Sequence, residues 1–559
     1  MINRREFFGA AAGSVLLAGL PQLHAAEAAR GKAPFRVLYS NDTTNIMSCV
    51  SPWHKKGEPF RTEMLEATVD EVAGTGVDAH LLQPGVGWVA WWPSKVYPAE
   101  EHYRWLKQTY GLDPDSFGRY VLAGGDIVKV FVDRCRQRGQ APFISYRLND
   151  GHHKEWAAAK PGEKVGGGAA QGLTRFYCEH PEYRIGPDLK DWSQRVLNWA
   201  IPEVRAHKFA FIQELCENYD LDGFELDFMR FYSFFQLDKT TSEQRRAVMT
   251  GFVRQVRELL DRTARGGRRR WLCARVPCYA DALDPLGLDL PAMVAAGLDM
   301  VNVSASYFTM QQTDFAAIRR MVPQAAVYTE MCHSIWNGKR ISQGYDSFIF
   351  RRATPEQMYT AAHLAYARGG DGVSAFNFVY YREHGGPGRG PFNEPPFQVF
   401  NGLLDPAWLA RQPQHYFLSS GWGNPFVKRA VLPRKIAAGQ TTKFTLDLAP
   451  PAGGWTKGGR FRIQAEAALG DSRPSTMLGA ALSLSKGRWR ATLNGQELAP
   501  TDDVSEPYPN PYPPMLGRPE ELRAWLVPAN LLRDGLNQIE VTLQSGDPAQ
   551  LAFLDLAAA

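Results

Sequence analysis

Two carboxyl groups lie two residues apart in one short stretch of this 559-residue chain: Glu225 and Asp227, within Asp222-Gly-Phe-Glu-Leu-Asp-Phe-Met-Arg230. Side chains alternate along a β-strand, so a strand here would present both carboxyl groups on the same face. Like charges at this spacing raise the pKa of one group, which makes it an acid and leaves the other ionised. The pattern therefore predicts general acid–base or nucleophilic chemistry by paired carboxyl groups.

Further polar side chains follow other apolar runs of the chain. We expect Glu330 to be the second reacting carboxyl group beside Asp227, with Glu225 as the substitute for either. The residues expected to orient a substrate are Arg147, Asn149, Asp150, His152, Arg230, His333 and Asn377. His and Asp also suit zinc or manganese, so a metal centre at Asp150, His152 and His153 is an alternative. This run has no His pair spaced i, i+4, and we predict neither a metal nor a cofactor.

Aromatic residues are abundant, at 12% of the chain with 15 Trp. Trp88, Trp91 and Trp92 form a cluster just after the apolar run at 78–83. Aromatic faces stack on the C–H faces of sugar rings, so the cluster predicts a carbohydrate subsite. Packing within a loop is the alternative interpretation.

These groups need a scaffold that brings distant segments together. Eight strands are expected, at 35–40, 78–83, 142–147, 222–228, 271–276, 300–304, 326–329 and 372–376. Amphipathic helices are expected between them, including 61–73, 203–218, 242–263 and 354–368. Strands alternating with helices predict a (β/α)8 TIM barrel over residues 31–412, with a doubly wound sheet as the alternative. Active sites of such barrels lie at the C-terminal ends of the strands, where the candidate residues are found.

The pattern changes past about residue 415. Short alternating runs at 430–436, 442–448, 460–465, 489–493, 524–527 and 538–543 are separated by turns such as Asn494-Gly495. This pattern predicts an all-β sandwich over 413–559. The stretch Ala491-Thr-Leu-Asn-Gly-Gln496 and the runs after it resemble the jelly-roll domains appended to many carbohydrate-active enzymes. The resemblance implies a domain that supports the barrel or binds glycan.

The first 30 residues are expected to be a targeting segment. Asn3-Arg-Arg-Glu-Phe-Phe8 precedes an apolar run at 9–20 and small residues around Ala25 and Ala28. This order resembles a twin-arginine export signal, too short to span a membrane stably. The mature protein is therefore predicted to be periplasmic or secreted.

Composition narrows the classes of partner. The chain has 63 Lys and Arg against 58 Asp and Glu, a net charge of +5, which is not the concentrated basic footprint of a nucleic-acid-binding protein. The seven cysteines contain no C-x-x-C pair, which argues against a zinc ribbon and a disulfide-dense scaffold. The oligomeric state is left open.

The segment from Asp222 to Phe231 resembles the strand-four signature of glycoside-hydrolase-like barrels, in which Asp-Gly precedes an inward Asp and a following Arg. It also resembles the Asp-Gly-x-Asp-x-Asp-x-Glu string of family 18 chitinases, although the final Glu falls on Met229 here. Glu330 is similar in placement to the nucleophile of clan A glycoside hydrolases, whose Asn-Glu pair on strand four is absent. The resemblance implies a two-carboxylate glycosidase with Asp227 and Glu330 as the pair.

The sequence thus predicts an exported glycoside hydrolase that cleaves a polysaccharide, oligosaccharide or glycoconjugate. Its two reacting carboxyl groups should lie ~5–9.5 Å apart, the range of retaining and inverting enzymes together. A non-catalytic carbohydrate-binding protein on a degenerate barrel is one alternative, motivated by Met229. A metal-dependent hydrolase centred on Asp150, His152 and His153 is the other.

Overall fold

The computed structural model describes residues 31–49, 51–55, 57–86, 89–160, 163, 165–166, 171–335, 351–382, 394–419, 431–467, 487–508 and 521–558. The predicted signal segment and Trp88 lie outside the described residues. The fold below is that of residues 35–558.

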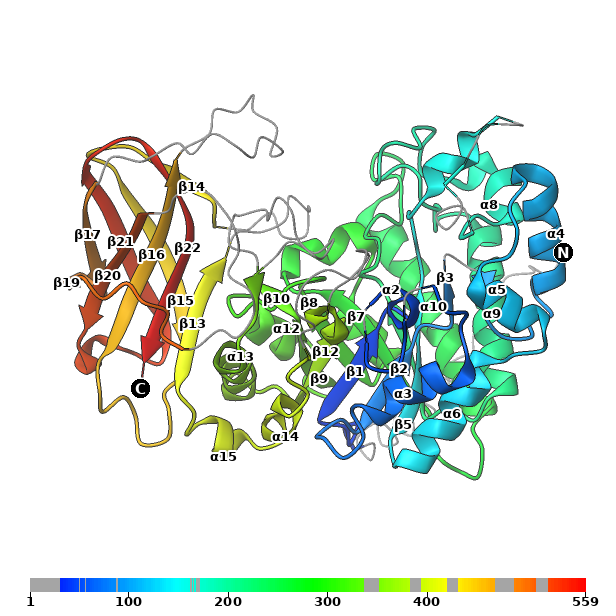
Figure 1. Ribbon diagram of the computed structural model, residues 1–559, viewed down its shortest axis with the longest axis horizontal. Coiled ribbons are helices and arrows are strands. Elements are labelled where there is room, and N and C mark those ends of the chain that lie inside the picture. Colours follow the sequence, from blue (N-terminus) through cyan, green and yellow to red (C-terminus); the bar gives the residue numbers. More distant parts are fainter. Residues whose placement is uncertain are drawn as a thin grey trace, which may run out of the picture. The chain divides into compact units, whose positions relative to one another are not determined.

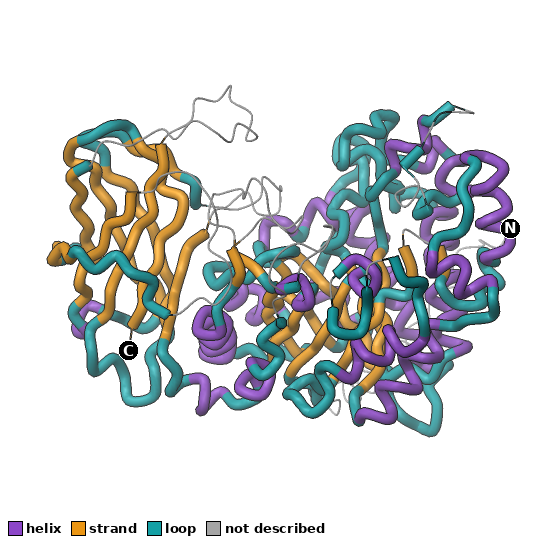
Figure 2. The backbone as a smooth tube through the Cα atoms, in the orientation of Figure 1, coloured by secondary structure: helices purple, strands orange, loops and turns teal. Residues whose placement is uncertain are grey.

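Eight parallel strands close into a barrel surrounded by helices (Figures 1 and 2). The strands are β1 (Val37–Asn41), β2 (Ala79–Leu82), β5 (Ala141–Arg147), β6 (Gly223–Asp227), β7 (Trp271–Pro277), β8 (Met300–Ser304), β9 (Ala326–Cys332) and β12 (Gly372–Phe376). Strand β1 pairs with β2 on one side and with β12 on the other, which closes the sheet. The predicted TIM barrel is confirmed in all eight strands, and the doubly wound alternative is wrong because an open sheet leaves two unpaired edges.

The helices follow the strands as the sequence periodicity predicts. They are α2 (Asn45–Ser48), α3 (Thr62–Asp70), α4 (Ala99–Tyr110), α5 (Ser116–Leu122), α6 (Ile127–Arg138), α8 (Arg175–Glu179), α9 (Pro202–Asn218), α10 (Ser242–Arg262), α11 (Leu290–Ala295), α12 (Phe315–Met321), α13 (Pro355–Ala367), α14 (Val399–Leu403) and α15 (Pro406–Leu409). Helix α13 begins with a capping box, in which Thr354 and Gln357 satisfy each other's backbone N–H groups. Helix α10 begins in the same way, at Thr241 and Gln244.

Aromatic rings close the N-terminal end of the barrel. Phe143 on β5 meets Phe35 edge-on at 5.2 Å, and Phe35 meets Trp271 at 6.3 Å. Only glycine fits at position 223 beside these rings, because a Cβ there would lie 2.0 Å from the Phe143 ring. The glycine of the Asp-Gly pair is therefore a packing requirement, and the polar side chains are left to the other end of the barrel.

Two antiparallel sheets form the C-terminal region. One contains β13 (Gln414–Ser419), β22 (Ala549–Ala558), β16 (Gly459–Ala467), β20 (Glu521–Val527) and β19 (Ala499–Thr501), with β14 (Arg434–Ile436) paired to β22. The other contains β15 (Thr441–Leu448), β21 (Gly535–Ser545), β17 (Arg488–Leu493) and β18 (Gln496–Glu497). Asn494 and Gly495 both have positive φ, 50° and 83°, as the predicted hairpin turn requires. The predicted all-β region is confirmed.

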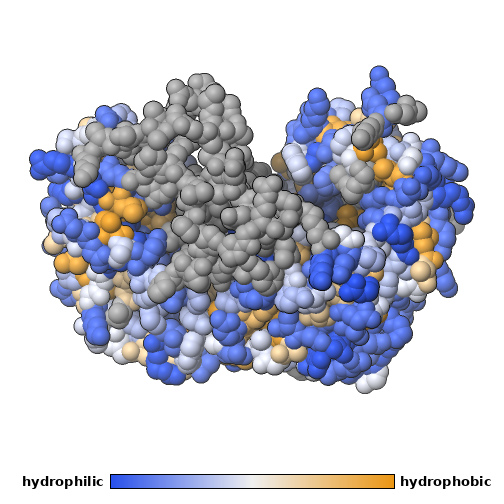
Figure 3. Space-filling view, in the orientation of Figure 1, coloured by the Kyte–Doolittle hydropathy of each residue, from blue (hydrophilic) through white to orange (hydrophobic). Residues whose placement is uncertain are grey.

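Two short antiparallel pairs complete the secondary structure: β3 (Gly85–Val86) with β4 (Val89–Ala90), and β10 (Ser334–Ile335) with β11 (Arg351–Arg352). All seven cysteines are free, in line with the absence of a predicted disulfide framework. In the view of Figure 3 the described surface is mainly hydrophilic. Among the described residues, no helix combines the length and the apolar character needed to cross a membrane.

Candidate active site

Arg275, on β7, lies between two carboxylates inside the barrel. Its Nη1 donates to both oxygens of Asp227 at 3.2 Å, and its Nε and Nη2 donate to Glu330 at 2.6 and 2.7 Å. All three side chains are buried. Burial by itself would lower the pKa of Arg275, but Glu330 and Asp227 together hold that pKa well above its ordinary value. The charged guanidinium therefore fixes both carboxylates.

Glu330 has no open position on its carboxylate. Oε1 also accepts a hydrogen bond from Ser304 Oγ at 2.5 Å, and Oε2 accepts one from Asn302 Nδ2 at 3.2 Å. Two donors on each oxygen occupy the four lone-pair directions of an ionised carboxyl group. This arrangement assigns Glu330 to holding Arg275, which corrects the expectation that it is one of the two reacting carboxyl groups.

Asp227 is held more loosely. Its Oδ1 accepts the backbone N–H groups of Met229 and Arg230 at 2.8 and 3.1 Å, in addition to Arg275. Its Oδ2 accepts only the shared Nη1 of Arg275, at 3.2 Å, among the described residues. Asp227 is the last residue of β6, so its carboxyl group lies toward the C-terminal end of the barrel. The side chain is fully buried, and Oδ2 is the less occupied of its two oxygens.

Glu225 lies on the same strand and face as Asp227, two residues deeper in the barrel. It accepts hydrogen bonds from Ser145 Oγ at 2.7 Å and Asn302 Nδ2 at 3.1 Å, and it has no direct cation partner among the described residues. Burial and the neighbouring Asp227 charge raise the pKa of Glu225 to about 7. Glu225 is thus a carboxyl group that keeps a proton near neutral pH.

A second cluster forms around Asp42, immediately after β1. Its Oδ1 accepts from Arg147 Nη2 at 2.5 Å, and its Oδ2 accepts from Arg230 Nη2 and Asn377 Nδ2, both at 3.1 Å. Burial alone would raise the pKa of Asp42, but Arg230 and Arg147 lower it below its ordinary value. Asp42 therefore neutralises the two arginines that the sequence predicted as substrate-orienting residues.

Asp150 and His152 extend this cluster outward. Asp150 accepts from Arg147 Nη1 at 2.9 Å through Oδ2 and contacts His152 Nδ1 at 2.7 Å through Oδ1. His153 points elsewhere, with its Nδ1 at 3.9 Å from Glu155. No group of three or more metal-ligating side chains occurs in the described part of the chain, and Asp150 is already engaged by a guanidinium. The metal alternative therefore has no support among the residues that the structure describes.

Three predicted substrate-orienting residues have structural roles here. Asn149 uses its side chain on the backbone of Leu197 and Ser233. Asn377 has a left-handed backbone conformation with φ of 51°. Its side-chain Oδ1 accepts from the Asp42 backbone N–H, and its Nδ2 donates to Asp42 Oδ2. His333 is buried, with its Nδ1 at 3.1 Å from Cys332 Sγ. All three side chains are buried and make these contacts within the protein, and their predicted contact with substrate stays a prediction.

Two of the three predicted tryptophans are also core residues. Trp91 and Trp92 are each only 2% exposed. Trp91 stacks on Phe117 with ring centroids 3.9 Å apart, and the Trp92 indole N–H donates to Glu214 at 2.9 Å. A sugar ring has no access to either face, so the predicted subsite is wrong for both residues and the loop-packing alternative holds.

Replacing Trp92 with Phe is expected to lower the free energy of unfolding by about 1–2 kcal/mol, because the buried Glu214 carboxylate loses one donor. Carbohydrate affinity should not change. Urea unfolding and glycan titration of the same samples measure the two effects separately. A weaker sugar affinity at unchanged stability would contradict this assignment.

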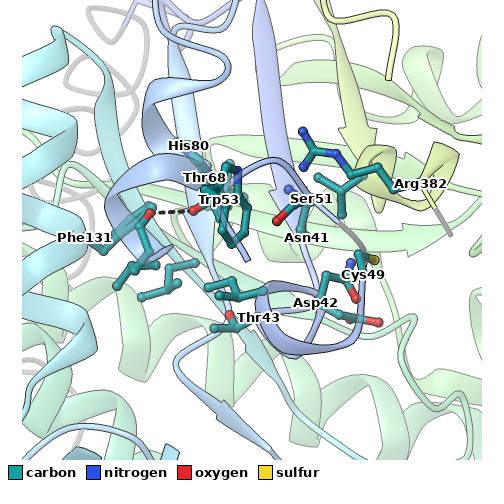
Figure 4. A pocket seen from close by; sticks show the side chains of 16 residues that line it. Asn41, Asp42, Thr43, Cys49, Ser51, Trp53, Thr68, His80, Phe131 and Arg382 are labelled. Carbon is teal, nitrogen blue, oxygen red and sulfur yellow. Dashed lines mark hydrogen bonds between the residues drawn. The ribbon is translucent and has the colours of Figure 1, made fainter. Parts of the chain in front are cut away.

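A small pocket of about 30 Å³ lies beside Asp42, between the end of β1 and the neighbouring helices (Figure 4). Its wall is partly apolar, with Ile46 and Phe131 among its members. Asn45 Oδ1 and Ser51 Oγ are among the buried wall atoms that have no hydrogen-bond partner in the described residues. Such atoms are normally satisfied by water or by a ligand group, so the cavity suits a small polar group next to Asp42.

Sequence reasoning missed three members of this site: Asp42, Gln83 and Arg275. Asp42 follows the first predicted strand, and Gln83 is the last residue of the second. Gln83 Oε1 accepts a hydrogen bond from Arg147 Nε at 3.0 Å. Arg275 alternates in phase with the inward positions of its strand and pairs in register with Asp227. Inward polar residues at every strand end were the signal that could have found all three.

Comparison with known proteins gives no sequence-level relative: neither a family model nor a curated protein matches the chain. Solved structures match at low similarity. A GH36 α-galactosidase from Geobacillus stearothermophilus is 11% identical, with 91% of this chain and 58% of that chain covered and a TM-score of 0.33. A putative α-L-fucosidase from Bacteroides thetaiotaomicron is 11% identical, with 94% and 97% covered and a TM-score of 0.32.

A GH20 β-N-acetylhexosaminidase from Streptomyces coelicolor A3(2) is 9% identical, with 68% of this chain and 62% of that chain covered and a TM-score of 0.34. The chain thus spans less than two thirds of the length of the galactosidase and the hexosaminidase.

Proposed function

We propose that this chain is an enzyme, a glycoside hydrolase that acts on a carbohydrate bound at the C-terminal end of the barrel. The observation that carries the proposal is the setting of Asp227: its carboxyl group is paired with Arg275, and its Oδ2 has a single donor at 3.2 Å. It lies at the end of the barrel where such folds place their chemistry. A glycosidase needs one carboxylate in this state to attack the sugar or activate water.

The same reaction needs a proton donor for the departing glycosidic oxygen. Glu225 is the group in this cluster that keeps a proton near neutral pH, with a pKa of about 7. It lies two residues from Asp227 on the same face, and two residues along a strand span ~6.6 Å. This is the spacing of the two backbone positions, and the mechanism requires the two carboxyl groups themselves to lie ~5–9.5 Å apart. We therefore assign Asp227 as the carboxylate and Glu225 as the acid.

The pH dependence of kcat/KM should report this acid. Activity is expected to fall above about pH 7, because Glu225 then loses the proton that it must donate. Glu225→Gln should lower the rate ~10²–10⁴-fold. The activity that remains should no longer fall above about pH 7. A Glu225→Gln enzyme that keeps both its rate and its limb would transfer the acid role to His152 with Asp150.

The same group makes stability depend on pH. The folded-state pKa of Glu225 lies above its unfolded value, so the folded protein binds more protons between pH ~4.5 and 7, and stability falls as pH rises through this window. The loss is on the order of 3 kcal/mol for a shift of this size. Glu225→Gln should flatten the dependence of unfolding free energy on pH across that window.

The proposal is tested by incubating the purified chain with a panel of polysaccharides and oligosaccharides of defined linkage and detecting released sugar. Turnover of one linkage that is lost in Asp227→Asn is the expected result. Binding of a glycan without turnover would favour a carbohydrate-binding protein on this barrel. Export, through the twin-arginine-like segment, remains part of the proposal, as does a supporting or glycan-binding role for the C-terminal sheets.

A further inference from the structure

Glu225, the proposed acid, is enclosed by other side chains. It is 1% exposed and lies two residues before the end of β6. A buried carboxyl group can give its proton only to a group that contacts it, so its hydrogen-bond partners decide where the proton goes. The partners of Glu225 among the described residues are Ser145, Asn302 and Cys273.

Asn302, on β8, shows which oxygen of Glu225 carries the proton. Its Nδ2 lies 3.1 Å from Glu225 Oε2 and 3.2 Å from Oε2 of Glu330, whose carboxylate binds Arg275. An amide nitrogen can only donate, and the carboxylate of Glu330 can only accept. Cys273 Sγ also donates to Glu225 Oε2, at 3.5 Å. Oε2 of Glu225 is thus an acceptor, which leaves Oε1 as the oxygen that carries the proton.

Oε1 of Glu225 faces the hydroxyl group of Ser145 on the neighbouring strand β5. The two oxygens are 2.7 Å apart, and the two residues pair in register. A hydroxyl group can both donate and accept. It donates to Glu225 when that carboxyl group is ionised and accepts from it when the group is protonated. In the protonated state the hydrogen of Ser145 must therefore point away from Glu225.

Ser145 also lines a small pocket. The pocket has about 20 Å³ of space, enough for about one water molecule, and Gln83, Tyr146 and Arg147 are among its other lining residues. Gln83 Nε2 and the Tyr146 hydroxyl are buried and have no hydrogen-bond partner in the described part of the chain. Buried polar atoms of this kind are normally satisfied by water. The pocket therefore suits one water molecule beside Ser145.

The local sequence explains why the pocket lies at this place. The register of β2 and β5 ends at Leu82 and Ile144. Pro84, which lines the pocket, has no N–H group with which to extend the ladder. Arg147, another lining residue, pairs in register with Asp227. The pocket thus lies between two strand ends, next to the strand that carries both proposed reacting carboxyl groups.

We propose that Ser145 relays the proton of Glu225 to one water molecule in this pocket, and that this water protonates the departing glycosidic oxygen. The inference rests on the proposed function and adds the route by which its buried acid reaches the substrate. Ser145 is a positioning residue in this scheme, because it acts through Glu225.

Three proton transfers make up the step. The Oε1–H bond of Glu225 breaks as Ser145 Oγ gains that proton, and the former Ser145 proton passes to the water. The water in turn gives a proton to the glycosidic oxygen, which leaves as an alcohol. Ser145 and the water end the step neutral, and Glu225 ends it as a carboxylate. Reversal of the same transfers, starting from the water that hydrolyses the sugar, returns the proton to Glu225.

The first measurement compares two leaving groups. The probes are the dinitrophenyl glycosides of glucose, galactose, xylose, fucose and N-acetylglucosamine, and the oligosaccharide that the glycan panel identifies. Dinitrophenolate departs without protonation, so only cleavage of the oligosaccharide needs the relay. Ser145→Ala should lower kcat on the oligosaccharide at least ~10-fold and leave kcat on the dinitrophenyl glycoside nearly unchanged. Ser145→Thr keeps the hydroxyl group and should recover most of the loss.

Ser374→Ala is the matched control. Ser374 is another buried serine of the barrel, and its hydroxyl contacts Asn302 Nδ2 at 3.2 Å. This variant should keep both activities. An equal loss of both activities in Ser145→Ala would show that Ser145 only supports the fold, and no loss of either would show that the proton takes another route. Each of these outcomes would overturn the relay and leave the glycosidase intact.

Infrared spectra test the contact between Ser145 and the proton without turnover. Spectra are recorded at about pH 5 and about pH 8, on either side of the Glu225 pKa of about 7. Protonated Glu225 should give a carboxyl C=O band at the lower pH that Glu225→Gln lacks. This band should shift in Ser145→Ala and stay in place in Ser374→Ala.

The charged groups around Glu225 are the same in the parent and in both serine variants. They are Asp227 on the same strand, Arg275 on β7 and Glu330 on β9, with the Cys273 thiol beside them. A shift of the band in Ser145→Ala therefore reports the lost hydroxyl group. A shifted band in a chain that hydrolyses none of the probes would support the Ser145 route and overturn the glycosidase. An unshifted band in an active enzyme would overturn the relay alone, and an unshifted band without turnover would overturn both.

Discussion

Asp227→Asn is expected to lower kcat at least ~100-fold on whichever glycan the enzyme cleaves, because the neutral amide can neither attack the sugar nor accept a proton from water. The amide keeps the size of the carboxyl group. It also keeps an oxygen for the Met229 and Arg230 N–H groups, which Asp227 accepts at 2.8 and 3.1 Å. The main loss should therefore be in kcat and not in KM, measured by steady-state kinetics on the substrate found by the panel.

Asp222→Asn is the matched control for this change. Asp222 precedes the same strand by one residue, but its carboxylate binds Arg136 at 2.6 and 2.8 Å and Arg268 at 3.1 Å near the barrel's other end. Its replacement should weaken these partly exposed ion pairs and leave kcat within about twofold. Equal losses in both variants would mean that Asp227 acts only through the fold.

A small nucleophile can also report the role of Asp227. If it attacks the sugar, azide or formate should restore turnover to Asp227→Ala and give a product with inverted configuration. If it activates water instead, azide should give no such product. Full activity of Asp227→Asn without any added anion would contradict both roles.

The barrel was predictable from the sequence because its signals are local. Eight short apolar runs, helical periodicity between them, and a capping box such as Thr354 with Gln357 each act within a few residues. The Asn494-Gly495 turn is likewise local, since its two positive φ angles suit those residue types. In these elements the conformation that the local sequence favours is also the one that tertiary packing requires.

The candidate site was only partly predictable, because its roles depend on contacts between distant residues. The spacing of Glu225 and Asp227 predicted two carboxyl groups on one face of a strand, and the pKa of Glu225 is raised to about 7. The saturation of Glu330 depends on Arg275, Ser304 and Asn302, whose convergence only the closed barrel creates. Trp91 shows the same limit, because it is covered by Phe117 from helix α5.

Arg275→Met is expected to lower the free energy of unfolding by about 3–5 kcal/mol at pH 8, the usual cost of removing one partner from a buried charge cluster. Methionine fills much of the same volume, so the loss should be mainly electrostatic. Two carboxylates, Asp227 and Glu330, would remain buried without the cation that now lies 2.6–3.2 Å from them. Urea unfolding at several pH values measures the effect.

The pH dependence of Arg275→Met identifies the cause of its instability. Without the guanidinium, burial raises the folded-state pKa of both carboxyl groups above their unfolded values, so the folded variant takes up protons as pH falls. The difference in stability between the parent and the variant should therefore be largest at pH 8 and shrink toward pH 5. Arg275→Met with Glu330→Gln should recover part of the loss, since one buried charge is then gone. Arg275→Lys keeps the charge but not the paired donors to Glu330, and should fall between parent and Met variant. A loss that is the same at every pH would show that Arg275 contributes by packing against Phe376, 4.0 Å from its guanidinium carbon, and not by holding the two carboxylates.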